Sequence, residues 1–198
     1  MVTYYGPNFE VIAASRDASL TLDCFKRCLM QDEPFKLIPS ETFYNTLWAG
    51  QEIKNSGFWT VNAGSAEGMV IGGNFLTFNF MQGTPFAMRD DPTSPLIYIL
   101  EDNGAESVYN VQNQLQLLIL QPDFRNVRGI LIGTFRRESN TTSDLLTKII
   151  KTKEELRNVP VIANVDFGQT VPTVTLPIVG YMRIEAKDNS DEIFILKK

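Results

Sequence analysis

Two polar clusters follow apolar stretches that have the length of a buried strand. Glu101 and Asp102 follow the run 96–100, and the segment 166–170 follows the run 159–165. Functional side chains gather at the carboxyl ends of strands in open α/β sheets, so the two clusters can converge on one crevice. A carboxylate there can orient a base or bind a cationic group. The alternative is a solvated turn in which Asp102 or Asn103 caps the next helix.

The chain contains no histidine, which restricts the chemistry that it can perform alone. It can form neither a Ser–His nor a Cys–His pair and cannot ligate zinc through imidazole. Catalysis would have to use carboxylates, lysine, tyrosine or an unusual base. One hypothesis is therefore a hydrolase that uses Glu101 and Asp166. We expect no metal and no cofactor.

The two cysteines, Cys24 and Cys28, lie four residues apart on an expected helix. Two cysteines in a chain of this length are too few for a disulfide framework. We interpret them as reduced thiols that pack like small apolar residues, which is typical of a cytosolic protein.

A glycine-rich segment and an aromatic segment could contact a ligand. Gly68 and the run 72–74 resemble a loop that binds phosphate at a helix N-terminus, although they match neither standard nucleotide-binding pattern. The alternative is a tight turn from strand to helix. Phe43, Tyr44 and Trp48 could stack on a planar ligand or cover the edge of the core.

The composition is that of a globular protein, with 198 residues, 43% hydrophobic residues and a net charge of −5. No basic stripe is present, so we expect no nucleic-acid partner. No apolar run approaches the ~20 residues that span a bilayer, and no signal segment opens the chain. We therefore expect a cytoplasmic protein without a membrane partner.

The order of expected elements predicts one α/β domain over residues 1–198. Apolar strand-length runs alternate with helical patterns in the second half, which indicates a mostly parallel central sheet. After Pro172, short strands separated by turns indicate a second, antiparallel layer. The expected helices are 19–30, 75–81, 106–120 and 143–156; the expected strands are 58–61, 69–71, 96–100, 129–133, 159–165, 173–176, 180–186 and 192–196; and 64–68 is an expected turn.

Six segments, in this order, resemble the serine LD-carboxypeptidases, a family that includes the microcin C self-immunity proteins. The segments 64–68 and the aromatic residues near Trp48 are most similar to the immunity-protein branch. The matching segments are TYYGPN (3–8), GSAEG (64–68), IGGNF (71–75), LED (100–102), GILIG (129–133) and VDFGQT (165–170), the last followed by TLP (175–177).

The resemblance implies a swivelling β/β/α domain, the C-terminal domain of these peptidases. The family cuts an amide between an L- and a D-centre in a cell-wall tetrapeptide, or detoxifies a peptidyl-nucleotide, with a Ser-His-Glu triad. Glu101 corresponds to the orienting acid and Gln169 to the histidine. The serine belongs to an N-terminal α/β domain that precedes the segment 3–8, and we expect that domain to be absent from this chain.

An amide such as that of Gln169 does not accept a proton near neutral pH. Because the serine is missing and Gln169 stands in place of the histidine, we expect the chain to be inactive alone. The alternative is a ligand-binding or interaction module derived from the family. Expected partners are a peptide or peptidyl-nucleotide ligand, the N-terminal domain and a second copy in a homodimer, with self-association through apolar surface. The predicted substrate-binding residues are Phe43, Tyr44, Trp48, Glu67 and Asp102.

Overall fold

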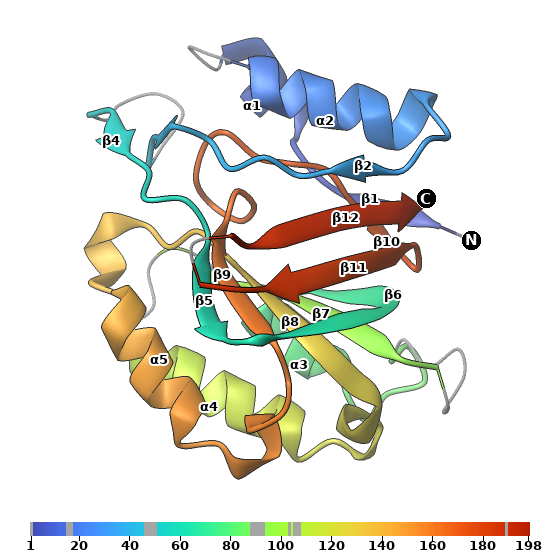
Figure 1. The fold of residues 1–198 in the computed structure, drawn as a ribbon, viewed down its shortest axis with the longest axis vertical. Helices are drawn as coiled ribbons and strands as arrows, with labels where there is room; N and C mark the ends of the chain where they lie inside the picture. Colours follow the sequence, from blue (N-terminus) through green and yellow to red (C-terminus); the bar gives the residue numbers. More distant parts are fainter. Residues whose placement is uncertain are drawn as a thin grey trace.

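The computed structural model describes residues 2–14, 18–45, 51–87, 94–102, 104, 108–188 and 190–198. These residues form a mixed α/β fold (Figure 1). The elements in chain order are β1 (Thr3–Tyr5), α1 (Phe9–Ala14), α2 (Ser19–Met30), β2 (Phe35–Lys36), β3 (Thr42–Phe43), β4 (Ile53–Lys54), β5 (Trp59–Asn62), β6 (Gly64–Asn74), α3 (Phe75–Met81), β7 (Leu96–Glu101), α4 (Val108–Ile119), η1 (Pro122–Asn126), β8 (Val127–Gly133), η2 (Arg137–Ser139), α5 (Ser143–Lys151), η3 (Glu154–Leu156), β9 (Val161–Val165), β10 (Leu176–Ile178), β11 (Tyr181–Ala186) and β12 (Glu192–Lys197).

The main sheet has eight strands in the order β2-β12-β11-β6-β7-β8-β9-β5. Its centre, β6 to β9, is parallel, and the strands on either side are antiparallel. Two further antiparallel pairs, β1–β10 and β3–β4, lie outside this sheet. The predicted combination of a parallel centre with antiparallel strands is confirmed, but β11 and β12 extend the main sheet itself.

Apolar side chains cover both faces of the central strands, as expected for buried parallel strands. Along β7, Ile97 and Ile99 face one core cluster, whereas Tyr98 and Leu100 face the other. The first cluster includes Cys24 of α2, and the second includes residues of α4 and α5. Figure 1 shows α1 and α2 on one side of the sheet, and α4 and α5 on the other.

The expected turn at 64–68 is wrong, because β6 is one continuous strand from Gly64 to Asn74. Its first half pairs with β11 and its second half pairs with β7. A Cβ on Gly68 would lie 2.6 Å from the carbonyl oxygen of Pro95. The glycine therefore permits close approach of the neighbouring backbone, whereas sequence patterns associate it most often with turns.

Two other boundaries differ from those predicted. The expected helix 143–156 divides into α5 and η3, because α5 ends at Lys151. The expected strand 173–176 is displaced to β10, which pairs with β1. The remaining helices and strands agree with the predictions within a few residues, although 106–107 at the start of the expected helix 106–120 lie outside the described residues.

The prediction that both cysteines are buried free thiols is confirmed. The Sγ atoms of Cys24 and Cys28 lie 3.4 Å and 3.2 Å from the carbonyl oxygen of Thr175. Among the described residues, no cluster of acidic or cysteine side chains could hold a metal ion. In the same part of the chain, no helix has the length and apolar character needed to cross a membrane.

Candidate functional site

Three parallel strands end at the same edge of the sheet. β7 ends at Glu101, and the loops that follow β8 and β9 carry Arg136 and Gln169. Neighbouring β6 ends with Asn74 paired to Glu101. The carboxyl ends of parallel strands meet at one edge, and the structure brings Glu101 and Gln169 together there.

Two glycines allow backbone to close around the Glu101 side chain. A Cβ on Gly133 would lie 2.4 Å from the carbonyl oxygen of Phe167 and 3.2 Å from the Cβ of Glu101. Gly168 has φ of +110°, a conformation that favours glycine, and a Cβ there would lie 3.3 Å from Glu101 Oε2. Glu101 is consequently only 3% exposed.

Burial raises the pKa of Glu101 to about 7, and the nearby charge of Asp102 adds to that increase. Hydrogen bonding from Asn74, Gln169 and Tyr5 lowers the pKa but does not offset burial. Oε2 of Glu101 is buried and has no hydrogen-bond partner among the described residues. Glu101 can therefore exchange a proton near neutral pH and has an oxygen available for a further donor.

A cavity of about 420 Å³ opens beside this cluster. Its walls come from the segment that follows β1 and from the loop that follows β9, with Arg136 beside Gln169. Burial and the neighbouring Glu101 raise the pKa of Tyr5, which also lines the cavity. The cavity therefore adjoins the side chains that surround Glu101 and is large enough for part of a small ligand.

Arg136 is a residue of this cavity that the sequence reasoning did not select. Its Nε donates to the carbonyl oxygen of Gln169 over 3.2 Å. A Cβ on Gly104 would lie 2.7 Å from its Cδ, so the arginine stem runs closely over that glycine. The rule that selected Glu101, a polar residue just beyond a buried strand, would also have found Arg136.

Asp166 belongs to a separate buried network. Its carboxylate accepts hydrogen bonds from the Ser40 backbone N–H and hydroxyl, both at 2.7 Å, and from Asn55 Nδ2 at 3.3 Å. Asn164 Nδ2 donates to Asn55 Oδ1 over 2.7 Å. Burial raises the pKa of Asp166 to about 6, although the Ser40 donors lower it. Asp166 thus fastens the segment around Ser40 and Asn55 to the sheet, and it does not share partners with Glu101.

The aromatic residues predicted to bind a ligand do not form one cluster in the described part of the chain. Phe43 is buried in β3, as expected of a residue that covers the core edge. Tyr44 pairs through its backbone with Val171, and its hydroxyl donates to Glu52 over 3.0 Å. Its ring lines another cavity, of about 550 Å³. Trp48 lies outside the described residues.

The remaining predicted binding residues occupy different parts of the sheet. Asp102 is buried and accepts a hydrogen bond from the Gly104 N–H over 3.1 Å, in the turn after β7. Glu67 is exposed in the first half of β6, opposite Arg183. Asn74 lies seven positions further along the same extended strand, a distance of about 23 Å. The structure therefore does not bring Glu67 to the Glu101 cluster.

The glycine-rich segment 72–74 joins a strand directly to a helix, in agreement with the tight-turn alternative. Asn74 Oδ1 accepts from the backbone N–H groups of Leu76 at 3.1 Å and Thr77 at 3.2 Å. These N–H groups at the start of α3 are therefore already satisfied by the protein.

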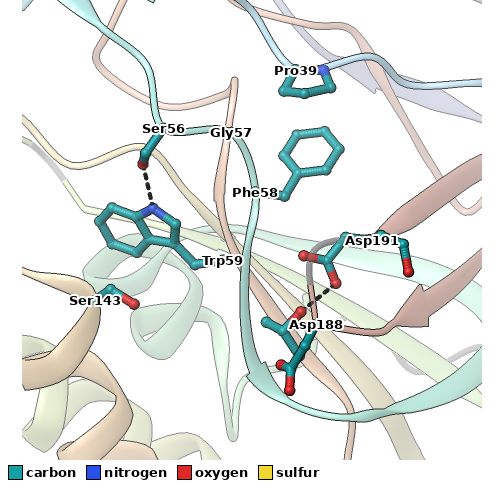
Figure 2. A pocket seen from close by; sticks show the side chains of 10 residues that line it. Pro39, Ser56, Gly57, Phe58, Trp59, Ser143, Asp188 and Asp191 are labelled. Carbon is teal, nitrogen blue, oxygen red and sulfur yellow. Dashed lines mark hydrogen bonds between the residues drawn. The ribbon is translucent and has the colours of Figure 1, made fainter.

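A larger cavity, of about 870 Å³, is lined mainly by residues 56–60 and by residues around Asp191. Figure 2 shows Phe58 and Trp59 of its lining, with the Trp59 indole N–H donating to Ser56 Oγ over 2.8 Å. Asp191 accepts from Thr60 Oγ1 over 2.7 Å. This cavity shares no described lining residue with the Glu101 site, so its size alone does not identify the site of chemistry.

Comparisons with known proteins agree with the fold. Residues 67–184 match the model of the family described as LD-carboxypeptidase C-terminal domain. The chain is 38% identical over 202 residues to "Putative carboxypeptidase YocD" of Bacillus subtilis (strain 168), covering all of this chain and 61% of that protein. It is 34% identical over 189 residues to "Putative carboxypeptidase" of Treponema pallidum (strain Nichols), covering 93% of this chain and 55% of that protein.

Solved structures of microcin immunity proteins and their relatives have the same fold as this chain. The MccF-like protein from Bacillus anthracis has a TM-score of 0.92 and 33% identity, covering all of this chain and 61% of the other. The microcin C7 self immunity protein MccF in complex with aspartyl sulfamoyl adenosine has a TM-score of 0.79 at 23% identity, covering all of this chain and 62% of the other, a likeness of fold. The chain thus spans about 61% of the length of the Bacillus subtilis relative.

Proposed function

The chain belongs to the LD-carboxypeptidase C-terminal domain family, and on that premise we propose that it binds a peptide or peptidyl-nucleotide beside Glu101 without hydrolysing it. The family predicted from the six sequence segments is confirmed. The observation that carries the proposal is the pair formed by Glu101 and Gln169, which combines an orienting acid with a side chain that cannot serve as a base.

The inactivity follows from the chemistry of the triad that the resemblance implies. In such a triad a histidine takes the proton of the attacking serine, and an acid holds the imidazole. The amide N–H₂ of Gln169 can donate to Glu101 as an imidazole N–H would. It offers no basic nitrogen to a serine, so the geometry is kept while proton transfer is lost. Loss of a triad base costs several orders of magnitude in rate.

The cavity beside Gln169 supports a binding role. It measures about 420 Å³, and its lining residue Gly168 packs against Glu101, whose buried Oε2 has no partner among the described residues. The microcin C7 self immunity protein MccF, which shares the fold of this chain, has been solved with aspartyl sulfamoyl adenosine and with glutamyl sulfamoyl guanosine. We propose a ligand of the same general kind, an acylated or peptidyl group joined to a nucleoside, or a cell-wall peptide.

We also propose that an N-terminal domain, which the resemblance implies, completes this site with the serine. We further propose that the chain forms a homodimer and that it is located in the cytoplasm. The two free thiols, Cys24 and Cys28, support a reducing compartment. Exposed apolar side chains on or beside α3 and α4, including Phe80, Leu117 and Leu120, support association with another protein surface.

Calorimetry tests the binding function. We expect a cell-wall tetrapeptide or aspartyl sulfamoyl adenosine to bind the chain with measurable heat, and the tetrapeptide to remain uncleaved in the same solution. Absence of heat with both ligands on folded protein would contradict the proposal. The matched variant is Glu101→Gln, which removes the charge at the site and should weaken binding.

A second candidate is a hydrolase in which Glu101 itself acts as the base. The pKa of about 7 favours it, since a general base works best with a pKa near the operating pH. The partner suggested by the sequence, Asp166, is engaged by Ser40 and Asn55. Peptide cleavage that Glu101→Gln abolishes and Asp166→Asn leaves intact would support this candidate over a binding module.

A further inference from the structure

A small cavity lies where the end of α5 meets β5. It measures about 160 Å³ and is lined by Asn62, Ile150, Lys151, Lys153, Glu154 and Arg157. Asn62 pairs with Val161, the first residue of β9, whereas Glu101 is the last residue of β7. Since β7, β8 and β9 run parallel, this cavity and the Glu101 site lie at opposite edges of the sheet. The cavity is therefore separate from the binding site proposed above.

Lys153 is the only buried lysine or arginine among the described residues. Its side chain is 9% exposed, and its Nζ donates to Gln116 Oε1 of α4 over 2.7 Å. An amide oxygen carries no net charge, and none of the ion pairs between described residues includes Lys153. Lysine is seldom buried without a counter-charge, because the ammonium loses its hydration. The position therefore calls for an anion.

Lys151 supplies a second ammonium group without a counter-charge in the described part of the chain. Its Nζ donates to Asn62 Oδ1, and Asn62 Nδ2 in turn donates to the carbonyl oxygen of Leu156 over 2.7 Å. An ammonium group has three N–H donors. Lys151 and Lys153 each donate to one acceptor within the described residues, so each retains two donors for a ligand.

The only carboxylate among the described residues of this lining does not neutralise the two lysines. Glu154 Oε1 lies 2.5 Å from Arg157 Nη2 in an exposed ion pair. The described lining thus has three positive charges and one negative charge, an excess of two positive charges. The whole chain has a net charge of −5, so this excess is local and does not reflect a generally basic surface.

We propose that this cavity binds a phosphate group through the ammonium groups of Lys151 and Lys153. A phosphate dianion matches the excess of two positive charges, and its oxygens can accept several ammonium N–H groups at once. A volume of about 160 Å³ suits a small tetrahedral anion and is below that of sites for larger organic ligands. Bound phosphate would connect α5 with β5 and α4, because Lys151 contacts Asn62 and Lys153 contacts Gln116.

Calorimetry with inorganic phosphate at low ionic strength tests the proposal on the whole chain. We expect one phosphate to bind per chain. Lys153→Gln, which keeps a donor for Gln116, and Lys151→Gln should each lower the affinity about tenfold or more, as loss of a charge-assisted hydrogen bond predicts. The matched control is Lys148→Gln, which changes an exposed lysine of α5 outside the lining and should keep the affinity within about twofold.

Urea unfolding provides a second measurement. Phosphate should raise the unfolding midpoint of the unaltered chain and of Lys148→Gln, but not that of Lys153→Gln. The same curves without phosphate show whether each variant folds. If Lys153→Gln does not fold, Lys151→Gln, which changes an exposed side chain, decides the question.

Two results would overturn the proposal. One is the absence of both heat and a midpoint shift when phosphate is added to the folded, unaltered chain. The other is an equal loss of affinity in Lys153→Gln and Lys148→Gln, which would indicate attraction to the surface in general. Glycerol 3-phosphate distinguishes the source of the group. Weaker binding than inorganic phosphate assigns the site to the free ion, and equal or tighter binding assigns it to a phosphate monoester.

Discussion

Gly168 packs directly against Glu101, because a Cβ on the glycine would lie 3.2 Å from the Cβ and 3.3 Å from Oε2 of the glutamate. The glycine also has φ of +110°. One residue therefore sets the backbone turn after β9 and the position of the Glu101 carboxylate.

Gly168→Ala should weaken the fold and disturb the site together. We expect a loss of about 1–3 kcal/mol from backbone strain, with an additional loss of ligand affinity because Glu101 must move. Gly73→Ala is the matched control, since Gly73 has φ of +144° but no atom within 4 Å of an added Cβ. Urea unfolding curves measure the loss of stability, and calorimetry measures the ligand affinity. Equal loss of affinity in both variants would contradict the contact between Gly168 and Glu101.

The burial of Glu101 predicts a stability that falls as the pH rises. Its pKa is 4.5 in the unfolded chain and about 7 in the fold, so the folded state binds more protons between these values. The contribution is present below pH 4.5 and lost through pH 7. It is at most about 3.5 kcal/mol, since a difference of one in pKa is worth about 1.4 kcal/mol.

Glu101→Gln should therefore flatten the dependence of unfolding free energy on pH between 4.5 and 7. Urea unfolding at pH 5 and pH 8 measures the change. The control is Glu67→Gln, an exposed glutamate on β6, which should leave the dependence unaltered. The same slope in Glu101→Gln as in the unaltered chain would show that the carboxylate is not desolvated.

The network around Asp166 predicts a large effect from a small change. Ser40→Ala removes one of the donors to a buried carboxylate. We expect a loss of about 1–3 kcal/mol at pH 8 and a smaller loss at pH 5, where Asp166 is protonated more often. Ser65→Ala, on the exposed face of β6, is the control and should change stability little.

Gln169→His would introduce the only histidine of the chain, so the imidazole signals in proton NMR would come from this one ring. We expect its pKa to lie above the usual value of about 6.5, because the ionised Glu101 favours the imidazolium. Adding Glu101→Gln should bring the pKa back to or below that value. An imidazole pKa that is the same in both variants would place Glu101 out of contact with residue 169.

The sequence predicts those site residues that directly follow a recognisable buried strand. Apolar runs of strand length predicted β7 and β9, and the polar residues after them predicted the meeting of Glu101 with Gln169. Tyr5 and Asn74 reach the same carboxylate from distant segments, and nothing in their local sequence marks that contact. Gly68 lies within a strand and not in the predicted turn, because close contact between strands requires glycine as turns do, but for a different reason.

The long strand β6 determines how cooperatively the main sheet unfolds. It pairs with β11 along its first half and with β7 along its second half, so neither side of the sheet can separate without breaking it. The two sides should unfold as a single cooperative unit, and the amide hydrogens of Met69, Val70 and Ile71 should exchange with deuterium only through global unfolding. The Glu101 end of the sheet is thereby protected from local fraying by strands at the opposite end.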